Sequence, residues 1–177
     1  IIINASGSWA SLIMSKNKKI IPPVKPIRGQ LIEIEAPDWL ITHNVCTYGS
    51  YLACKNKNRV LIGSTMEDAG FDKSITKEGI SQLMKNAVEI VPEINDCVLV
   101  DKWAGLRPTS PDKLPILGRT EAENLLIATG TYRNGILLAP IIGKLISDII
   151  ITSKEPDIIK PFKLERFATK DKNNDYL

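Results

Sequence analysis

Hydrophobic and polar positions follow two rhythms along this chain, one typical of strands and the other of helices. Short apolar runs that end at turn residues predict buried strands. These runs occupy residues 1–3, 31–35, 51–54, 59–64, 97–103 and 125–128. Residues 31–35 alternate apolar and acidic side chains, which indicates a strand with one buried face. The polar residues 55–58 would join two of these strands as an antiparallel pair.

Helical spacing of apolar residues predicts two helices. One begins after Thr76, a residue type that caps helix N-termini, and runs to Val91, where Pro92 stops it. The other runs over residues 136–150 with one broad apolar face, and Pro140 is expected in its first turn. Together the elements predict an α+β fold. It has a mostly antiparallel sheet with one helix, followed by a strand–turn–helix that docks elsewhere.

Three segments have no periodic pattern, and we expect them to be irregular. Lys16–Lys19 read as a solvated basic loop, and residues 104–118 read as a loop because they contain three prolines. From about Lys154 the chain becomes polar and charged, and we expect a tail that is frayed after Phe167.

The composition of the 177 residues is that of an ordinary soluble globular protein, with 44% apolar and 24% charged residues. The net charge of +3 is small, and no basic stripe with aromatic residues is present, which argues against a nucleic acid partner. Cys46, Cys54 and Cys97 are odd in number and lack CxxC spacing, which favours reduced thiols in a cytoplasmic protein. His43 is the single histidine, so no metal site is expected.

Two further features concern membranes and the start of the chain. The apolar run over residues 136–151 is interrupted by Lys144 and Asp148, and we expect it to be too short to span a bilayer. No segment resembles a signal peptide. The chain starts at Ile1, without a methionine, inside an apolar run. We therefore expect a fragment whose upstream sequence is missing.

The stretch over residues 124–143 joins a strand, a glycine-containing loop and the start of a helix. At such a junction the backbone N–H groups and the positive end of the helix dipole can face an electron-rich ligand. A second turn of small residues, at positions 4–9, follows the first predicted strand. Small residues there let the backbone approach another surface closely.

Three motifs resemble, in order and spacing, segments of the FAD-dependent D-amino acid oxidase family. They are WAGLRP at 103–108, LPILG at 114–118 and ATGTYRNGILLAP at 128–140. Residues 4–9, 26–30 and 59–66 also resemble segments of that family. The similarity is greatest to its glycine oxidase branch, which serves thiamine biosynthesis in many bacteria, and it covers residues 1–152.

The resemblance implies an architecture of two domains. Members of this family combine an FAD-binding domain, opened by a GxGxxG strand–turn–helix, with an antiparallel substrate domain. This chain has no GxGxxG motif, so the resemblance implies a C-terminal half that binds FAD well only with the N-terminal flavin half, in cis or in trans. The implied parts are the end of an FAD-domain segment at 1–20, a substrate domain at 21–105, a return to the FAD domain at 106–153, and a polar tail at 154–177.

The resemblance also implies roles for individual residues. Arg107 would clamp the carboxylate of an amino acid substrate, for which a planar guanidinium is well suited. Tyr51 would help to hold that carboxylate through its hydroxyl, and Met66 would form a wall of the pocket. Arg133 would lie near the substrate and the flavin ring. The implied cofactor-facing positions are Gly7, Gly130, Arg133, Asn134, Gly135, Ile136 and Leu137.

The reaction implied is oxidative deamination of a small amino acid, glycine or a D-amino acid, with hydride transfer from Cα to FAD and formation of hydrogen peroxide from oxygen. It needs no dedicated base, and His43 is expected to be solvated. Tyr48–Ser50 and Thr131 depart from the family pattern, which leaves the substrate open. The alternatives are a sarcosine-type amine oxidase or an FAD dehydrogenase, and a non-catalytic fragment or subunit. Formation of a homo-oligomer is also left open.

Overall fold

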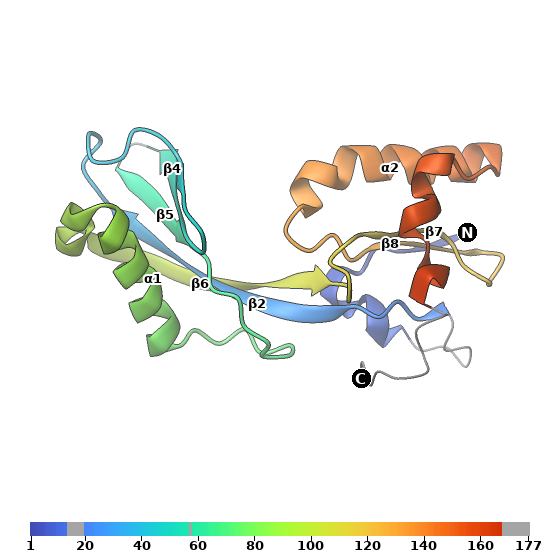
Figure 1. Ribbon diagram of the computed structural model, residues 1–177, viewed down its shortest axis with the longest axis horizontal. Helices are drawn as coiled ribbons and strands as arrows, with labels where there is room; N and C mark the ends of the chain where they lie inside the picture. Colours follow the sequence, from blue (N-terminus) through green and yellow to red (C-terminus); the bar gives the residue numbers. More distant parts are fainter. Residues whose placement is uncertain (14–19, 57, 168–177) are drawn as a thin grey trace. The chain divides into compact units, whose positions relative to one another are not determined.

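The computed structural model describes residues 1–13, 20–56 and 58–167, and the chain divides into two compact units (Figure 1). We call Ile27–Leu106 the inserted unit, and Ile1–Pro26 together with Arg107–Leu177 the terminal unit. The basic loop predicted at Lys16–Lys19 and the frayed end predicted after Phe167 lie outside the described residues.

The inserted unit is built on a five-stranded sheet with the strand order β3-β4-β5-β2-β6. Its strands are β2 (Lys25–Glu35), β3 (Val45–Cys46), β4 (Tyr51–Asn56), β5 (Arg59–Gly63) and β6 (Val98–Thr109). β4 and β5 form the predicted antiparallel hairpin, in which Tyr51 lies opposite Gly63. β2 is antiparallel to β5 on its other side, with Leu31 opposite Gly63.

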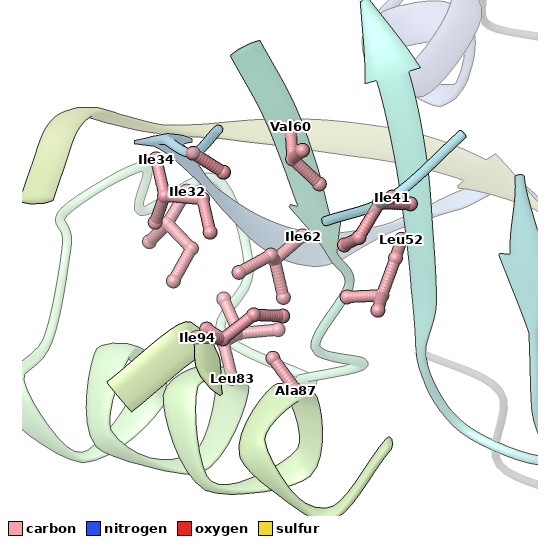
Figure 2. Packing of buried hydrophobic residues seen from close by; sticks show 10 residues of the cluster. Ile32, Ile34, Ile41, Leu52, Val60, Ile62, Leu83, Ala87 and Ile94 are labelled. Carbon is pink, nitrogen blue, oxygen red and sulfur yellow. The ribbon is translucent and has the colours of Figure 1, made fainter. Parts of the chain in front are cut away.

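One face of this sheet forms an apolar core, because side chains alternate between the two faces along each strand. This face packs against α1 (Lys77–Ile90) and the 3-10 helix η3 (Pro92–Asp96). Figure 2 shows the sheet residues pointing toward the helical ones. Its labelled core residues are Ile32, Ile34, Ile41, Leu52, Val60, Ile62, Leu83, Ala87 and Ile94.

The predicted N-cap of the first helix is confirmed. The hydroxyl oxygen of Thr76 accepts a hydrogen bond from the N–H of Gly79 at 3.1 Å, just where α1 begins. A Thr at this position satisfies one of the backbone donors that an α-helix leaves without an intrahelical partner. The sequence pattern therefore located both the helix and its start.

The terminal unit contains a three-stranded sheet with the order β1-β8-β7. β8 (Leu125–Thr129) is central, and it runs parallel to β1 (Ile2–Asn4) and antiparallel to β7 (Ile116–Arg119). The helices of this unit are α2 (Gly135–Thr152) and the 3-10 helices η1 (Gly7–Leu12), η4 (Asp157–Phe162) and η5 (Leu164–Phe167). One core cluster of the sheet and its helices consists of Leu117, Leu126, Ile146, Ile149 and Ile159.

The prolines predicted a loop over residues 104–118, which is correct for residues 110–115 and wrong on either side of them. β6 continues to Thr109, and β7 already begins at Ile116. β6 is the last strand in the order of its sheet, so Pro108 lies on an edge strand, where the missing N–H removes no ladder bond. The carbonyl of Pro108 instead accepts a hydrogen bond from the N–H of Tyr132 at 2.9 Å.

The second predicted helix is confirmed, but the position of Pro140 within it is not. Because α2 begins at Gly135, Pro140 lies in its second turn rather than its first. Residue 140 therefore donates no hydrogen bond to the carbonyl of Ile136, one turn earlier. Asn134 occupies the N-cap position, directly before Gly135, the first residue of the helix.

By length and composition alone, α2 is long and apolar enough to cross a membrane, which differs from the expectation that this run is too short. The same properties belong to helices that pack in a protein core. Ile146 and Ile149 are buried in the terminal unit, whereas Leu137 and Ile151 are 79% and 77% exposed. One side of α2 is thus packed, and another carries exposed apolar side chains.

Residues 154–167 differ from the polar tail that their composition predicts. Ile159 and Leu164 are buried in the terminal unit, on η4 and η5. The Arg166 guanidinium donates from Nε to Asp112 Oδ2 at 2.7 Å and from Nη2 to Asp112 Oδ1 at 3.1 Å. The average composition of residues 154–167 does not show that Ile159 and Leu164 are buried or that Arg166 forms a bidentate ion pair. These contacts attach the segment to the terminal unit.

Candidate active site

The carboxyl ends of β1 and β8 lie at one edge of the terminal unit's sheet, because the two strands are parallel, with Ile2 beside Leu125. η1 begins at Gly7, shortly after β1, and α2 begins at Gly135, shortly after β8. The hydroxyl of Thr129 donates to the carbonyl of Gly7 at 3.0 Å and ties these two chain segments together. This edge is where open α/β sheets bind their ligands.

Three of the predicted cofactor-facing glycines lie at this edge. Gly7 and Gly130 have φ values of +57° and +71°, in the left-handed region that favours glycine. A Cβ on Gly130 would come within 3.3 Å of Ile116, and one on Gly135 within 2.9 Å of Thr131 Oγ1. A side chain at 130 or 135 would therefore displace a neighbouring side chain, and the positive φ at 130 also favours glycine.

The N-terminus of α2 is open, as a site for an electron-rich group requires. Among the described residues no side chain caps it, and its first turn contains no acidic residue. The N–H of Asn134 donates to the carbonyl of Thr131 at 2.9 Å. Ile136 and Leu137 are 96% and 79% exposed beside the first-turn N–H groups. Polar donors and apolar side chains together fit the edge of a flavin ring, which is both electron-rich and aromatic.

The strand that carries Arg107 is bonded to the loop that carries Arg133. Thr109 and Thr131 form an antiparallel bridge, and the carbonyl next to Arg107 accepts the hydrogen bond from the Tyr132 N–H. Tyr132 has a φ of +49°, so the chain turns there toward α2. Arg107 is half-buried and Arg133 is exposed. Both cations are thus attached, through one backbone bridge, to the loop that leads into α2.

Tyr51 and Met66 belong to the inserted unit. Tyr51 is half-buried, and its ring lies over Gly63, because a Cβ on that glycine would come within 2.6 Å of the tyrosine Cζ and hydroxyl. The buried hydroxyl of Ser50 donates to the Gly63 carbonyl at 3.2 Å and fixes the neighbouring backbone. Met66 is 59% exposed in the irregular segment between β5 and α1.

Sequence reasoning did not single out Gly63 or Arg28. Counting back along the predicted hairpin from loop 55–58 would set Ile62, not Gly63, opposite Tyr51, because an irregularity between Cys54 and Asn56 shifts the register by one residue. Arg28 is bonded to Glu67 and Asp72, which are 39 and 44 residues away in sequence. A partner that distant leaves no local signal.

The histidine and the cysteines all belong to the inserted unit. His43 is exposed, with its Nδ1 2.9 Å from the hydroxyl of Thr42, and the three cysteines are free thiols. The described residues contain no group of three or more His, Cys, Asp or Glu that could hold a metal ion. A cavity of about 280 Å³ in the inserted unit is lined by Asp38, Cys54 and Arg59, among others, and by none of the predicted site residues.

Comparison with known proteins gives consistent results over most of the chain. Residues 1–149 match the family described as FAD dependent oxidoreductase. The chain is 42% identical over 169 residues to the hydrogen cyanide synthase subunit HcnC of Pseudomonas protegens, which covers 95% of this chain and 40% of that protein. It is 34% identical over 171 residues to the glycine oxidase of Geobacillus kaustophilus, which covers 96% of this chain and 45% of that protein.

The crystal structure of that glycine oxidase has the same fold, with a TM-score of 0.82 at 35% identity, and the alignment covers 93% of this chain and 45% of the other. The chain thus spans less than half the length of these relatives. The α+β fold and the family resemblance of the motifs are confirmed. With most of its residues matched, the chain belongs to the DAO family of FAD-dependent oxidoreductases.

Proposed function

We propose that this chain supplies the substrate-holding residues and the flavin-facing edge of an oxidoreductase that oxidises a small amino acid at its Cα–N bond. The observation that carries the proposal is the Thr109–Thr131 bridge, which attaches Arg107 to the loop before the open N-terminus of α2. FAD, when bound, accepts the hydride equivalent that leaves Cα. The residues of this chain orient the substrate and hold the cofactor edge.

Arg107 binds the substrate carboxylate in this proposal. A guanidinium presents two parallel N–H donors to a carboxylate and keeps its charge at any physiological pH, so it fixes both the position and the rotation of the amino acid. A substrate held in this way presents its Cα–H in one direction, which lowers the entropic part of the barrier. Arg133 adds a second cation, on the loop that is bridged to the strand of Arg107. The roles of Tyr51 and Met66 rest on the family resemblance.

The open N-terminus of α2 holds the cofactor edge in this proposal. The backbone N–H groups over residues 135–137 would donate to the electron-rich side of the flavin ring, and the positive end of the helix dipole would favour negative charge there. Gly7 and Gly130 allow a close approach of the backbone at the same sheet edge. These contacts serve the ring alone, so the chain by itself is expected to bind FAD weakly.

The rest of the cofactor would be bound by an N-terminal flavin half, present in cis or in trans. Two features of the terminal unit support a further segment there. Ile1, Ile2 and Ile3 are 69%, 58% and 44% exposed, and β1 is an edge strand of its sheet, as described. Exposed apolar edges of this kind are usually covered in native proteins. We place the assembled protein in the cytoplasm, where its thiols remain reduced.

Glycine is the first substrate to test. A glycine oxidase and a hydrogen cyanide synthase subunit are both similar to this chain. Glycine and hydrogen cyanide are both very small compounds with a carbon–nitrogen bond, which is a single bond in glycine and a triple bond in hydrogen cyanide. The 42% identity to the HcnC subunit favours a second candidate function, in which the flavin passes its electrons to an acceptor other than oxygen, within a larger assembly.

The experiment uses the flavin-loaded protein, with glycine, sarcosine and D-alanine as substrates. Peroxide release in air indicates an oxidase. Reduction of an artificial acceptor without peroxide indicates a dehydrogenase, and cyanide release identifies the second candidate. Arg107→Ala should raise the Michaelis constant by about a hundredfold, the value of a lost charged hydrogen-bonded contact of roughly 3 kcal/mol, and leave the flavin spectrum unchanged.

Arg107→Lys should recover part of that loss, because lysine keeps the charge but lacks the planar fork. Lys85→Ala, on the exposed side of α1, is the matched control and should match wild type. Wild-type kinetics for Arg107→Ala would remove this residue from the carboxylate clamp. A flavoprotein that oxidises none of the three amines would contradict the proposed function itself.

A further inference from the structure

Arg28 is the centre of a polar cluster on one side of β2, and it is only 6% exposed. Its Nε and Nη2 donate to Glu67 Oε2 at 3.1 and 2.5 Å. Its Nη1 donates to Asp72 Oδ2 at 2.8 Å and to the carbonyl and hydroxyl oxygens of Ser74 at 3.1 and 3.2 Å. Each of the three guanidinium nitrogens thus bonds to the segment that connects β5 to α1.

Gln30, two residues further along β2 and fully buried, continues the cluster. Its Nε2 donates to Glu67 Oε1 at 2.9 Å and to the Thr76 hydroxyl at 3.0 Å, and its Oε1 accepts from the Thr76 N–H at 2.9 Å. Gly79 leaves room for this amide, because a Cβ there would collide with Gln30 Nε2. The cluster therefore reaches from β2 to the first turn of α1.

Polar bonds to β2 hold this connecting segment in place. Over residues 64–76, all of them described, none is buried, and the large apolar side chains of Met66 and Phe71 are 59% and 40% exposed. The segment contains no helix and no named strand. A segment without buried apolar contacts opens easily unless hydrogen bonds tie it down. Arg28 supplies several of those bonds, to Glu67, Asp72 and Ser74.

Met66 is held between two residues that are bonded to β2. Arg28 and Glu67 exchange both backbone hydrogen bonds, at 2.8 and 3.0 Å, and the Gln30 N–H donates to the Thr65 hydroxyl at 2.8 Å. Glu67 points its side chain at Arg28, and Met66, directly before it, has an exposed side chain. The bonds of Arg28 thus fix where the exposed Met66 side chain stands.

We infer that Arg28 is a positioning residue, which sets the site of substrate binding by anchoring the segment that carries Met66. This inference deepens the proposed function, because it rests on Met66 forming a wall of the amino acid pocket. Arg28 itself touches no reacting atom. When the bonds of Arg28 are weakened, the Met66 side chain moves. Small substrates then bind less tightly, while the chemistry at Cα is unaffected.

The test is made in the flavin-loaded protein with Asp72→Asn, Arg28→Lys and Arg28→Met. Asp72 has a half-exposed side chain, so its neutral amide variant should fold even where a variant of the buried arginine does not. Amide hydrogen exchange over residues 65–76 should rise about tenfold in Asp72→Asn, with the second half of α1 unchanged. The Michaelis constant for glycine should rise about fivefold at constant kcat, the pattern of a lost binding contact.

Arg28→Lys should lie between wild type and Arg28→Met in both measurements, because an ammonium reaches fewer of these acceptors. Glu78→Gln, on the exposed side of the first turn of α1, is the matched control. Unchanged exchange in the variants would overturn the anchoring role. Faster exchange with an unchanged Michaelis constant would overturn the link to the substrate. A wild-type protein that oxidises no amine would instead overturn the proposed function, and the exchange data would still decide the anchoring.

Discussion

The ring of Tyr51 lies over Gly63, its partner across the β4–β5 hairpin, so closely that a Cβ on Gly63 would come within 2.6 Å of the tyrosine hydroxyl. Glycine at 63 is therefore a condition for the present orientation of Tyr51. If Tyr51 holds the substrate carboxylate, as the family resemblance implies, its hydroxyl is placed by the absence of a side chain on the neighbouring strand.

Gly63→Ala should displace the Tyr51 ring and destabilise the protein by about 1–3 kcal/mol, the usual cost of an overpacked site. Denaturant unfolding measures this loss, and the Michaelis constant for glycine should rise to that of Tyr51→Phe or beyond. Gly105→Ala is the matched control, because a Cβ there would meet nothing within 4 Å. Equal stability of the two alanine variants would contradict the close contact.

Thr129→Val should loosen the tie between the end of β8 and the turn at Gly7. The hydroxyl of Thr129 is buried and donates to the Gly7 carbonyl at 3.0 Å, so the valine variant loses about 1–3 kcal/mol of unfolding free energy, the cost of an acceptor left without its donor. Thr129→Ser retains the donor and should recover most of the loss. We also expect Thr129→Val to bind FAD more weakly, measured by flavin release on dilution. Identical stability of the valine and serine variants would exclude this role of the hydroxyl.

Asp112 makes stability depend on acidity. Burial alone raises its pKa, but hydrogen bonds from Arg166, from the Leu114 N–H and from Ser110 outweigh this and lower the pKa to about 2. The carboxylate is therefore more acidic in the folded than in the unfolded chain. Its contribution is complete above about pH 4, the ordinary pKa of an aspartate, and is lost as the pH falls toward about 2.

Asp112→Asn should reduce the unfolding free energy at pH 7 by roughly 1–2 kcal/mol and by much less at pH 2.5. Unfolding in urea at both pH values measures the difference. Asp157→Asn is the control, since that carboxylate is 90% exposed in its pair with Lys160 and should contribute little at either pH. A loss that is the same at both pH values would show that Asp112 acts through its shape rather than its charge.

Truncating a buried and an exposed side chain of α2 should change the stability of the protein by different amounts. Ile149 is fully buried and Ile151 is 77% exposed. Ile149→Ala should cost about 2–5 kcal/mol through the lost burial and the cavity, whereas Ile151→Ala should stay within about 0.5 kcal/mol in this chain. Thermal unfolding compares the two variants. A larger cost for Ile151→Ala in the flavin-loaded protein than in the isolated chain would show that a further segment covers that side of α2.

Periodicity predicted the elements whose partners are local. The β4–β5 hairpin and α1 with its Thr76 cap depend on contacts between residues that are close in sequence, and the pattern predicted both. The strand character of residues 104–109 was missed because it depends on Pro108 lying at the edge of a sheet, which is a tertiary fact. The burial of Ile159 and Leu164 was missed for the same reason.

The candidate site likewise has features that were visible as sequence motifs and features that depend on tertiary pairing. The glycine turn before α2 and the arginine of WAGLRP were visible as motifs, and the structure adds the bridge that attaches one to the other. The partners of Arg28 and the contact of Tyr51 with Gly63 arise from pairing between strands and segments. Their roles in binding and catalysis stay predictions until the variants are measured.

The pairing of β1 with β8 also governs the order in which the chain can acquire structure as it is synthesised. Leu125, the partner of Ile2, is made only after the whole of residues 27–106. The inserted unit can thus complete its sheet first, while the strand at residues 2–4 remains without its partner and exposes isoleucines to solvent. Closing such a long loop is slow and leaves an aggregation-prone edge in the meantime. Yield should therefore depend on translation speed and chaperone supply more than the modest size of the chain would indicate.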